Sequence, residues 1–106
     1  MYNIRTLRFR IENQKISKST GCDFSGLVKG TSGYLKAYFT FSQEWKGCQK
    51  AASFWKLGKE YPVLIINGEC EIPQEALTWD NFQVSVTGIR NDNFVITTNK
   101  LIIEQG

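Results

Sequence analysis

Carboxylates are the side chains best suited to acid–base chemistry in this chain, because its 106 residues include no histidine. Glu69 and Glu71 are spaced so that, on a strand, they share one face and stand as neighbours. The paired carboxylates of glycosidases lie instead on separate elements across a cleft, ~5–9.5 Å apart. Nothing in the sequence marks a nucleophile or an oxyanion hole beside the pair. We therefore interpret both glutamates as solvent-facing and predict that the protein is not an enzyme.

The missing histidine also restricts metal and nucleophile chemistry. Histidine is the commonest metal ligand and the usual general base near neutral pH, so Ser–His and Cys–His pairs and His-containing zinc sites are excluded. Cys22, Cys48 and Cys70 are widely spaced and form no CxxC pair, which disfavours zinc and redox motifs. We expect three reduced, at least partly buried thiols in a protein made in the cytosol, with no cofactor or metal. A Cys22–Cys48 or Cys48–Cys70 bridge stays open.

Basic residues exceed acidic ones only slightly, 13 against 10. A nucleic-acid-binding domain more often concentrates them in a stripe. The best candidate stripe consists of Arg5, Arg8, Arg10, Lys15 and Lys18. Arg8 and Arg10 alternate with apolar residues on one strand face, which we interpret as solvated rather than phosphate- or sugar-facing. No apolar run approaches the ~20 residues of a membrane helix, and residues 1–5 lack the apolar region of a secretory signal. Neither nucleic acid nor a membrane is a favoured partner.

Residues 21–33 contain four glycines and several Ser and Thr residues, which predict a long loop. Its glycines do not spell GxGxxG or GxxxxGK[ST], so the segment is not a phosphate-binding motif. Long loops on β-sandwiches often carry the binding surface.

Three tryptophans, Trp45, Trp55 and Trp79, raise the possibility of a carbohydrate-stacking surface, because a flat exposed ring can stack on a sugar face. Large aromatic rings also dominate cores and interfaces. Trp45 and Trp55 sit beside predicted strand ends, and we favour core or rim packing for them.

Residues 34–41 form the clearest strand pattern. The residues that we expect to point inward are Leu35, Ala37, Phe39 and Phe41, and those that we expect to point outward are Tyr34, Lys36, Tyr38 and Thr40. Tyrosine is enriched at protein contacts because one end is apolar and the other forms hydrogen bonds. The four outward residues are our candidate protein interface.

Strand patterns recur at roughly ten-residue intervals with turn residues between them. Asn67-Gly68 is the strongest hairpin signal, and residues 69–72 are predicted to pair back on the strand before it. Residues 73–77 form the only helix-like stretch, with Pro73 at a favoured first position. The pattern predicts one all-β domain, residues 1–106. Its expected architecture is an antiparallel β-sandwich, immunoglobulin-like or jelly-roll-like, of about 7–9 strands with one short helical turn near residues 73–77.

Four segments in order resemble small β-sandwich modules of tailed phages and prophages of Gram-positive bacteria. They are the turn at Trp45 and Gly47, the Cys-x-Ile-Pro-x-Glu-x-Leu segment with Pro73 and Leu77, the Val-x-Val-x-Gly strand ending at Gly88, and residues 97–101. The resemblance covers roughly residues 27–104. Some such modules begin head-fibre or other virion surface proteins. The resemblance implies scaffold roles: Trp45 and Gly47 turn one strand into the next, residues 73–77 cross between sheets, and Gly88 ends or bulges its strand.

The expected function is that of a non-catalytic, phage-encoded binding module, a virion component made in the bacterial cytoplasm. It would act by protein contact in capsid, tail or fibre attachment, or as a decoration protein. No fibre shaft follows Gly106, which favours a stand-alone role. Two alternatives stay open: a small phage inhibitor of a host defence system, and a carbohydrate-binding module. A homo-oligomer is also possible, since an unpaired strand edge is a template for another chain.

Overall fold

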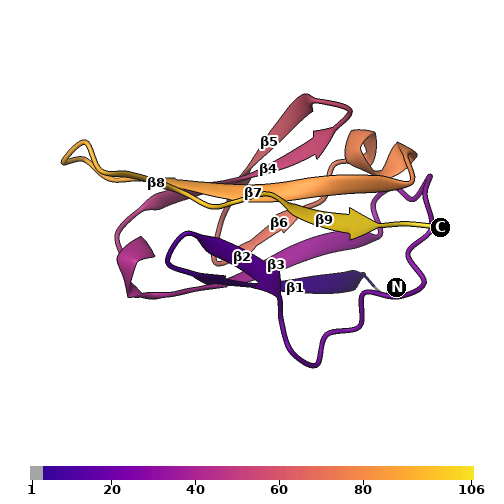
Figure 1. Ribbon diagram of the computed structural model, residues 1–106, viewed down its shortest axis with the longest axis horizontal. Coiled ribbons are helices and arrows are strands. Elements are labelled where there is room, and N and C mark those ends of the chain that lie inside the picture. Colours follow the sequence, from indigo (N-terminus) through magenta and orange to yellow (C-terminus); the bar gives the residue numbers. More distant parts are fainter. Residues whose placement is uncertain (1–3) are drawn as a thin grey trace.

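The computed structural model describes residues 4–106, in which nine strands form two packed sheets (Figure 1). Sheet A has the strand order β2-β1-β3-β6, and Sheet B has the order β5-β4-β7-β8, with β9 also paired to β7. The bounds are β1 Arg5–Glu12, β2 Lys15–Lys18, β3 Leu35–Phe41, β4 Gln49–Lys56, β5 Lys59–Ile65, β6 Glu69–Glu71, β7 Asn81–Ile89, β8 Val95–Thr97 and β9 Leu101–Glu104. Residues 1–3 lie outside the described residues. They belong to the predicted domain and to the segment 1–5, which we predicted not to be part of a secretory signal.

The predicted all-β sandwich is confirmed, but one strand pair is not antiparallel. β1 and β3 run parallel over seven residue pairs, from Arg5 opposite Leu35 to Ile11 opposite Phe41. Parallel neighbours need a crossover of a dozen or more residues, and here β2 and the segment 19–34 supply it. The strand order differs from that of the immunoglobulin constant domain. What is confirmed is therefore the all-β class with two packed sheets.

The core lies between the sheets and is built by alternation along the strands. In β1, Leu7, Phe9 and Ile11 are buried while Arg8 and Arg10 are exposed, and β3 buries Leu35, Ala37 and Phe39, as predicted. Sheet B contributes side chains of zero exposure from β4, β7 and β9: Ala52, Phe54, Phe82, Val84, Val86 and Ile103. Apolar burial of this kind contributes roughly 25 cal/mol per Å². Because side chains alternate along a strand, burial of the apolar residues places the polar residues between them on the outer faces.

Three connections carry the chain between the sheets, and two of them contain a short 3₁₀ turn. The 3₁₀ turn η1 (Gln43–Trp45) links β3 to β4, and η2 (Gln74–Thr78) links β6 to β7. The crossing at residues 73–77 is therefore confirmed, one residue later than expected, with Pro73 in the extended conformation before η2. η1 was not predicted.

The Asn67-Gly68 turn has the positive φ angles of a tight hairpin turn, 55° and 80°. The pairing predicted after it is nevertheless wrong. A single bridge, Ile66 with Glu69, follows the turn, and β6 then pairs with β3 instead of β5. The chain changes sheets here, which supplies Sheet A with its fourth strand.

Three segments of the resemblance lie at buried or tightly turned positions. Trp45 and Leu77 are fully buried, and Gly47 adopts a φ of 80° that favours glycine. Gly88 neither ends nor bulges its strand, which corrects the sequence interpretation. It lies within β7, opposite Lys50 of β4 and Ile96 of β8. Its lack of a side chain makes room for Trp45 instead.

Candidate binding surface

Three of the four predicted interface residues share the outer face of Sheet A. Lys36 and Tyr38 are half-buried there and Thr40 is exposed, because Ala37 and Phe39 of the same strand point into the core. Tyr34 precedes β3 and has a different environment, described below. Of the predicted interface residues, Lys36, Tyr38 and Thr40 thus lie on a strand face, whereas Tyr34 lines a neighbouring pocket.

The parallel pairing of β1 with β3 joins the arginine residues to this face. Arg8 lies opposite Tyr38, and Arg10 lies opposite Thr40. The guanidinium carbon of Arg8 stands 5.1 Å from the centroid of the Tyr38 ring, a cation–π contact. The sequence analysis treated the arginines and the tyrosine as separate groups, because only the register of two distant strands brings them together.

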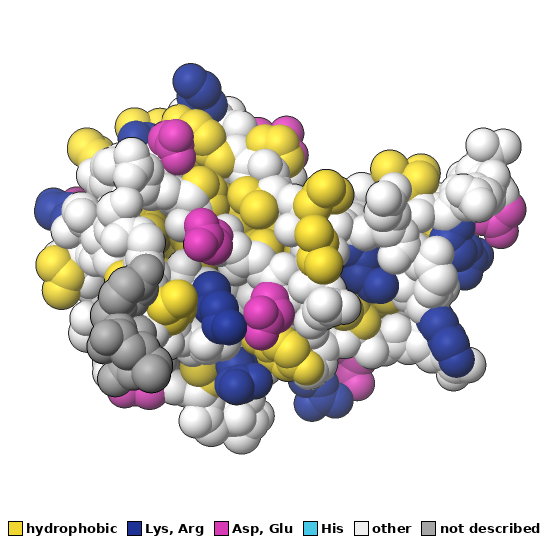
Figure 2. Space-filling model, turned by 180° about the vertical axis from the view of Figure 1, so that it is seen from behind, with side chains coloured by type: hydrophobic (Ala, Val, Ile, Leu, Met, Phe, Trp, Pro, Cys, Tyr) yellow, Lys and Arg dark blue, Asp and Glu magenta, His cyan; other side chains and the backbone are white. Residues whose placement is uncertain are grey.

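β6 adds the two glutamates to the same face. Glu69 lies opposite Tyr38 and Glu71 opposite Lys36, and the ammonium of Lys36 is 3.3 Å from the Glu69 carboxylate. The solvent-facing interpretation of both glutamates agrees with their exposure. We define the Sheet A outer face by the residues Arg8, Arg10, Lys36, Tyr38, Thr40, Glu69 and Glu71. Basic and acidic side chains also lie beside one another in the space-filling view (Figure 2).

Most of the basic residues considered as a stripe have partners within the chain. Arg10 pairs with Glu12 at 2.9 Å, and Lys18 lies 5.2 Å from the centroid of the Phe24 ring. Arg5 turns away to donate to loop carbonyls. The result is a surface of mixed charge, consistent with the solvated-face interpretation.

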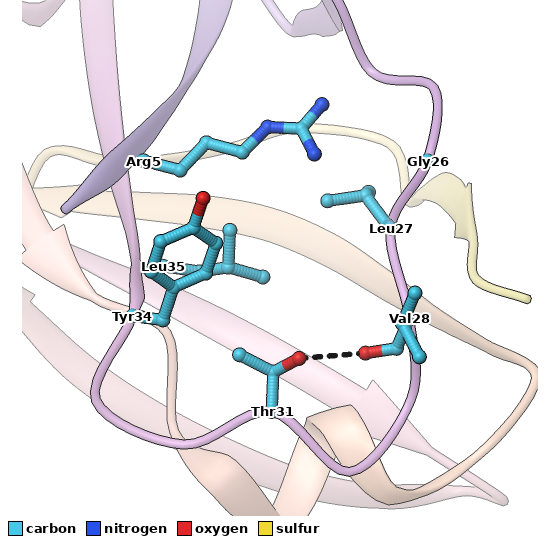
Figure 3. Close-up of a pocket in the computed structure, with 7 residues that line it drawn as sticks. All are labelled: Arg5, Gly26, Leu27, Val28, Thr31, Tyr34 and Leu35. Atoms are coloured by element: carbon cyan, nitrogen blue, oxygen red, sulfur yellow. Dashed lines mark hydrogen bonds between the residues drawn. The ribbon is translucent and has the colours of Figure 1, made fainter. Parts of the chain in front are cut away.

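Tyr34 lines a pocket of about 230 Å³ at the end of β1 and β3 where both strands begin (Figure 3). Nη2 of Arg5 donates to the carbonyl oxygens of Asp23 and Ser25, at 2.8 and 2.7 Å, which holds the guanidinium in place. Leu27 and Leu35 supply apolar walls and are each 4% exposed. The pocket combines one fixed cation, one phenol and an apolar surface.

Residues 26–31 of the predicted glycine loop form the other side of this pocket. The loop is anchored at its middle: Leu27 O accepts from Gly106 N at 2.7 Å, and Gly30 N donates to Leu77 O at 2.7 Å. Thr31 Oγ1 donates to Val28 O at 2.7 Å (Figure 3). The sequence pointed to the loop as a binding element, but it carried no signal that Arg5 and Tyr34 meet beside it.

The tryptophans occupy three different environments. Trp45 is fully buried and its indole nitrogen donates to Asn13 O at 2.8 Å, so it has no face free to stack on a sugar. The indole nitrogen of Trp55 donates to Ser85 Oγ at 3.0 Å, and the ammonium of Lys100 stands 3.8 Å from the ring centroid. Trp79 is 47% exposed. The packing prediction holds fully for Trp45 and in part for Trp55.

All three thiols are free, so neither open disulfide forms. Burial raises the pKa of the Cys70 thiol to about 12, and the neighbouring Glu71 carboxylate adds to the rise. A neutral thiol is a poor nucleophile and a poor metal ligand. Within residues 4–106 no group of three or more Cys, Asp or Glu side chains is placed to hold a metal ion.

No helix among the described residues is long and apolar enough to cross a membrane. Comparisons with models of protein families, with curated proteins and with solved structures found no match for this chain.

Proposed function

We propose that the protein is a non-catalytic binding module that holds a protein partner through the Sheet A outer face and the Tyr34 pocket. The observation that carries the proposal is the Arg8–Tyr38 stack, 5.1 Å from guanidinium carbon to ring centroid, on a rigid sheet. Arg and Tyr are enriched among the residues that dominate binding energy, and a pre-ordered pair loses little conformational entropy on binding.

The mixed charge of the face defines the partner that it fits. Arg8, Arg10 and Lys36 alternate with Glu69 and Glu71 across neighbouring strands. A protein surface whose acidic and basic side chains alternate in the complementary order would attract both the basic and the acidic residues of this face. A uniformly anionic polymer would instead be repelled by the two glutamates. The pocket beside Tyr34 would receive one anchoring side chain of that partner.

We further propose that the partner is a subunit of a bacteriophage virion, at the capsid, tail or fibre, and that the protein is made in the cytoplasm of the bacterial host. This setting rests on the resemblance of the ordered segments around Trp45, Pro73, Leu77 and Gly88 to phage β-sandwich modules. Mass spectrometry of particles purified from the encoding phage or prophage tests it. The chain should be present in stoichiometric amount, and its absence from intact particles would overturn the virion role.

The binding surface is tested with the purified chain and those particles, or subunits released from them. Tyr38→Ser and Arg8→Ala should each lower partner affinity by about thirtyfold or more while the melting temperature stays within a few degrees, because truncation of a hot-spot residue costs about 2 kcal/mol or more. Thr97→Ala, a surface change on Sheet B, is the control and should leave affinity unchanged. Equal affinity of all four proteins would remove the Sheet A outer face from the proposal. Capture of a host protein by a chain that particles lack would instead favour the inhibitor function.

A further inference from the structure

The pocket beside Tyr34 combines one charged side chain with an apolar floor. Seven described residues line it, and Arg5 is the only charged one among them. Leu27 and Leu35, each 4% exposed, form the floor, while Val28 at 62% and Tyr34 at 47% stand at the rim. Its volume of about 230 Å³ lies below the ~300–1,000 Å³ of sites for drug-sized ligands. The pocket therefore has the size for a single residue of a partner.

The guanidinium of Arg5 is held in place through one nitrogen only. Nη2 donates to the carbonyl oxygens of Asp23 and Ser25, and these bonds use both of its hydrogens. Nε and Nη1 also carry N–H groups, which have no acceptor among residues 4–106. A pre-ordered cation with unused donors loses little conformational entropy when an anion binds to it.

The neighbouring Asp23 carboxylate is bonded to Ser25 rather than to the guanidinium. Oδ1 of Asp23 accepts from Ser25 N at 2.8 Å and from Ser25 Oγ at 2.6 Å. These bonds are the main causes that lower the pKa of Asp23, and the charge of Arg5 is a smaller one. Within the described part of the chain no carboxylate forms an ion pair with Arg5. Its positive charge is therefore not neutralised by direct contact.

The polar groups of the pocket lie together on one side. Figure 3 shows the Tyr34 hydroxyl directed toward Arg5, with Thr31 on the opposite side of the pocket. The Thr31 hydroxyl already donates to Val28 O at 2.7 Å. An occupant thus meets a cation and a phenol on one side and apolar surface elsewhere.

We propose that this pocket binds the C-terminal residue of the protein partner, with its α-carboxylate at Arg5 and the Tyr34 hydroxyl and its apolar side chain on the floor. The inference rests on the proposed function, because it names the part of the partner that enters the pocket. The carboxylate complements the one cation of the pocket, and a hydrogen bond between two charged groups is stronger than one between neutral groups. Capture of a chain end by its carboxylate is an established mode of peptide recognition.

A C-terminal residue fits this pocket better than an internal Asp or Glu residue of the partner. In a C-terminal residue the carboxylate and the side chain leave the same Cα in different directions, so both can be bound at once. An internal acidic residue carries its carboxylate at the end of a short methylene stem. That stem would cover little of the apolar surface of Leu27 and Leu35, and burial of apolar surface is what stabilises an apolar anchor.

Titration of the purified, isotope-labelled chain with N-acetyl-leucine, followed by NMR, tests the proposal. At low salt the probe should cause saturable shifts at the amides of residues 26–35 and at the Arg5 Nε–H, with a dissociation constant on the order of 1 mM. N-acetyl-leucinamide lacks the charge and N-acetylglycine lacks the side chain, so each should bind about tenfold more weakly or worse. Equal binding of either compound, or no saturable shift in this region, would overturn the proposal.

An internal acidic side chain is the competing occupant, and N-acetylglutamic acid α-amide represents it in the same titration. This compound has the same single negative charge but no free α-carboxylate. It should bind more weakly than N-acetyl-leucine, because its stem covers less of the apolar floor. Binding as tight as that of N-acetyl-leucine would overturn the choice of a C-terminal residue.

Two exposed valines provide a matched pair of variants. Val28 stands at the pocket rim and Val95 lies on Sheet B, and each is 62% exposed. Val28→Glu should weaken N-acetyl-leucine binding by about tenfold or more, because like charges repel, whereas Val95→Glu should bind it as the wild type does. Arg5→Gln should also lose the probe, but it removes two loop contacts as well, so the valine pair decides if that variant fails to fold. Unchanged probe binding by Val28→Glu would contradict the proposal.

Probe binding and partner binding are separate measurements, so the inference and the proposed function can fail independently. N-acetyl-leucine is titrated into the isolated chain, whereas partner affinity is measured with particles or their subunits. A chain that binds particles but not the probe would overturn the inference and leave the proposed function in place. A chain that binds the probe at this pocket but no particle component would support the inference for the pocket and overturn the virion role.

Discussion

Gly88 and Trp45 pack so closely that a Cβ at position 88 would lie 2.9 Å from Cε3 of the Trp45 ring and 3.0 Å from Cβ of Cys48. The indole ring is fully buried and reaches the glycine from η1, the connection between β3 and β4. Glycine is thus required at this point of β7 by close packing, not by a positive φ angle.

Gly88→Ala should lower the free energy of unfolding by about 1–3 kcal/mol, because overpacking forces side chains off their rotamers. Gly106→Ala is the matched control: its Cβ would lie 3.7 Å from the nearest atom, an ordinary contact. Urea denaturation of both variants measures the difference. Equal midpoints would show that the Trp45 ring can move aside without cost.

Trp45→Ala should destabilise the fold by ~3–5 kcal/mol, the range for truncation of a buried tryptophan. Trp45→Phe should cost less, because it keeps an aromatic ring but loses the 2.8 Å bond to Asn13 O. Trp79→Ala, at a half-exposed ring, should stay within about 1 kcal/mol of wild type. Thermal unfolding monitored by circular dichroism gives all three values, and a Trp45→Ala variant as stable as Trp79→Ala would contradict the scaffold role.

A double-mutant cycle with Arg8→Ala and Tyr38→Ser should give a coupling of about 0.5–1 kcal/mol in the free energy of unfolding, as expected for an exposed cation–π pair. The same cycle on Arg10 and Tyr38 should give no coupling, because Arg10 pairs with Glu12. Chemical denaturation of the single and double variants provides the energies. Coupling of similar size in both cycles would indicate a general effect of removing the Tyr38 side chain rather than the specific stack with Arg8.

Asn99→Ala should cost about 1–3 kcal/mol, because it leaves the N–H of Ile16, a residue only 1% exposed, without its acceptor. Asn99 also donates from its backbone to Gln14 O at 3.1 Å, a bond that the variant retains. Hydrogen exchange should therefore speed up at the Ile16 amide more than at Phe9 or Phe39. An unchanged Ile16 exchange rate would show that water replaces the asparagine.

The raised pKa of Cys70 should protect its thiol in the folded protein. At mildly alkaline pH, a thiol reagent should modify the half-buried Cys22 quickly, and Cys48 and Cys70, each 8% exposed, only at the rate of unfolding. The unfolded state loses the Cys70 proton near pH 9 and the native state near pH 12. The stability associated with Cys70 is thus fully present below about pH 9 and is lost as pH rises toward 12, with a slope of up to about 1.4 kcal/mol per pH unit. Cys70→Ala should remove this part of the pH dependence, and an identical slope in that variant would contradict it.

The local patterns of the sequence predicted much of the fold and part of the candidate surface. The alternation of Leu35, Ala37 and Phe39 with Lys36, Tyr38 and Thr40 gave the correct inner and outer faces of β3. The Asn67-Gly68 turn was located correctly, but the destination of the strand after it was not. Tyr34 does not lie on the predicted outer face, because β3 begins only at Leu35. Alternation of apolar and polar residues does not show at which residue a strand begins.

Alternation, turn residues and composition determined by themselves which side chains lie inside, where the chain turns, and that no histidine chemistry is available. These properties depend on the backbone angles and residue types of short segments, so a single sequence contains them. Only the tertiary structure decided that Arg8 meets Tyr38, that Gly88 lies against Trp45, and that Arg5 and Tyr34 share a pocket. Such contacts depend on which distant strands pair and in what register. That choice is made by burying the apolar faces of both sheets at once.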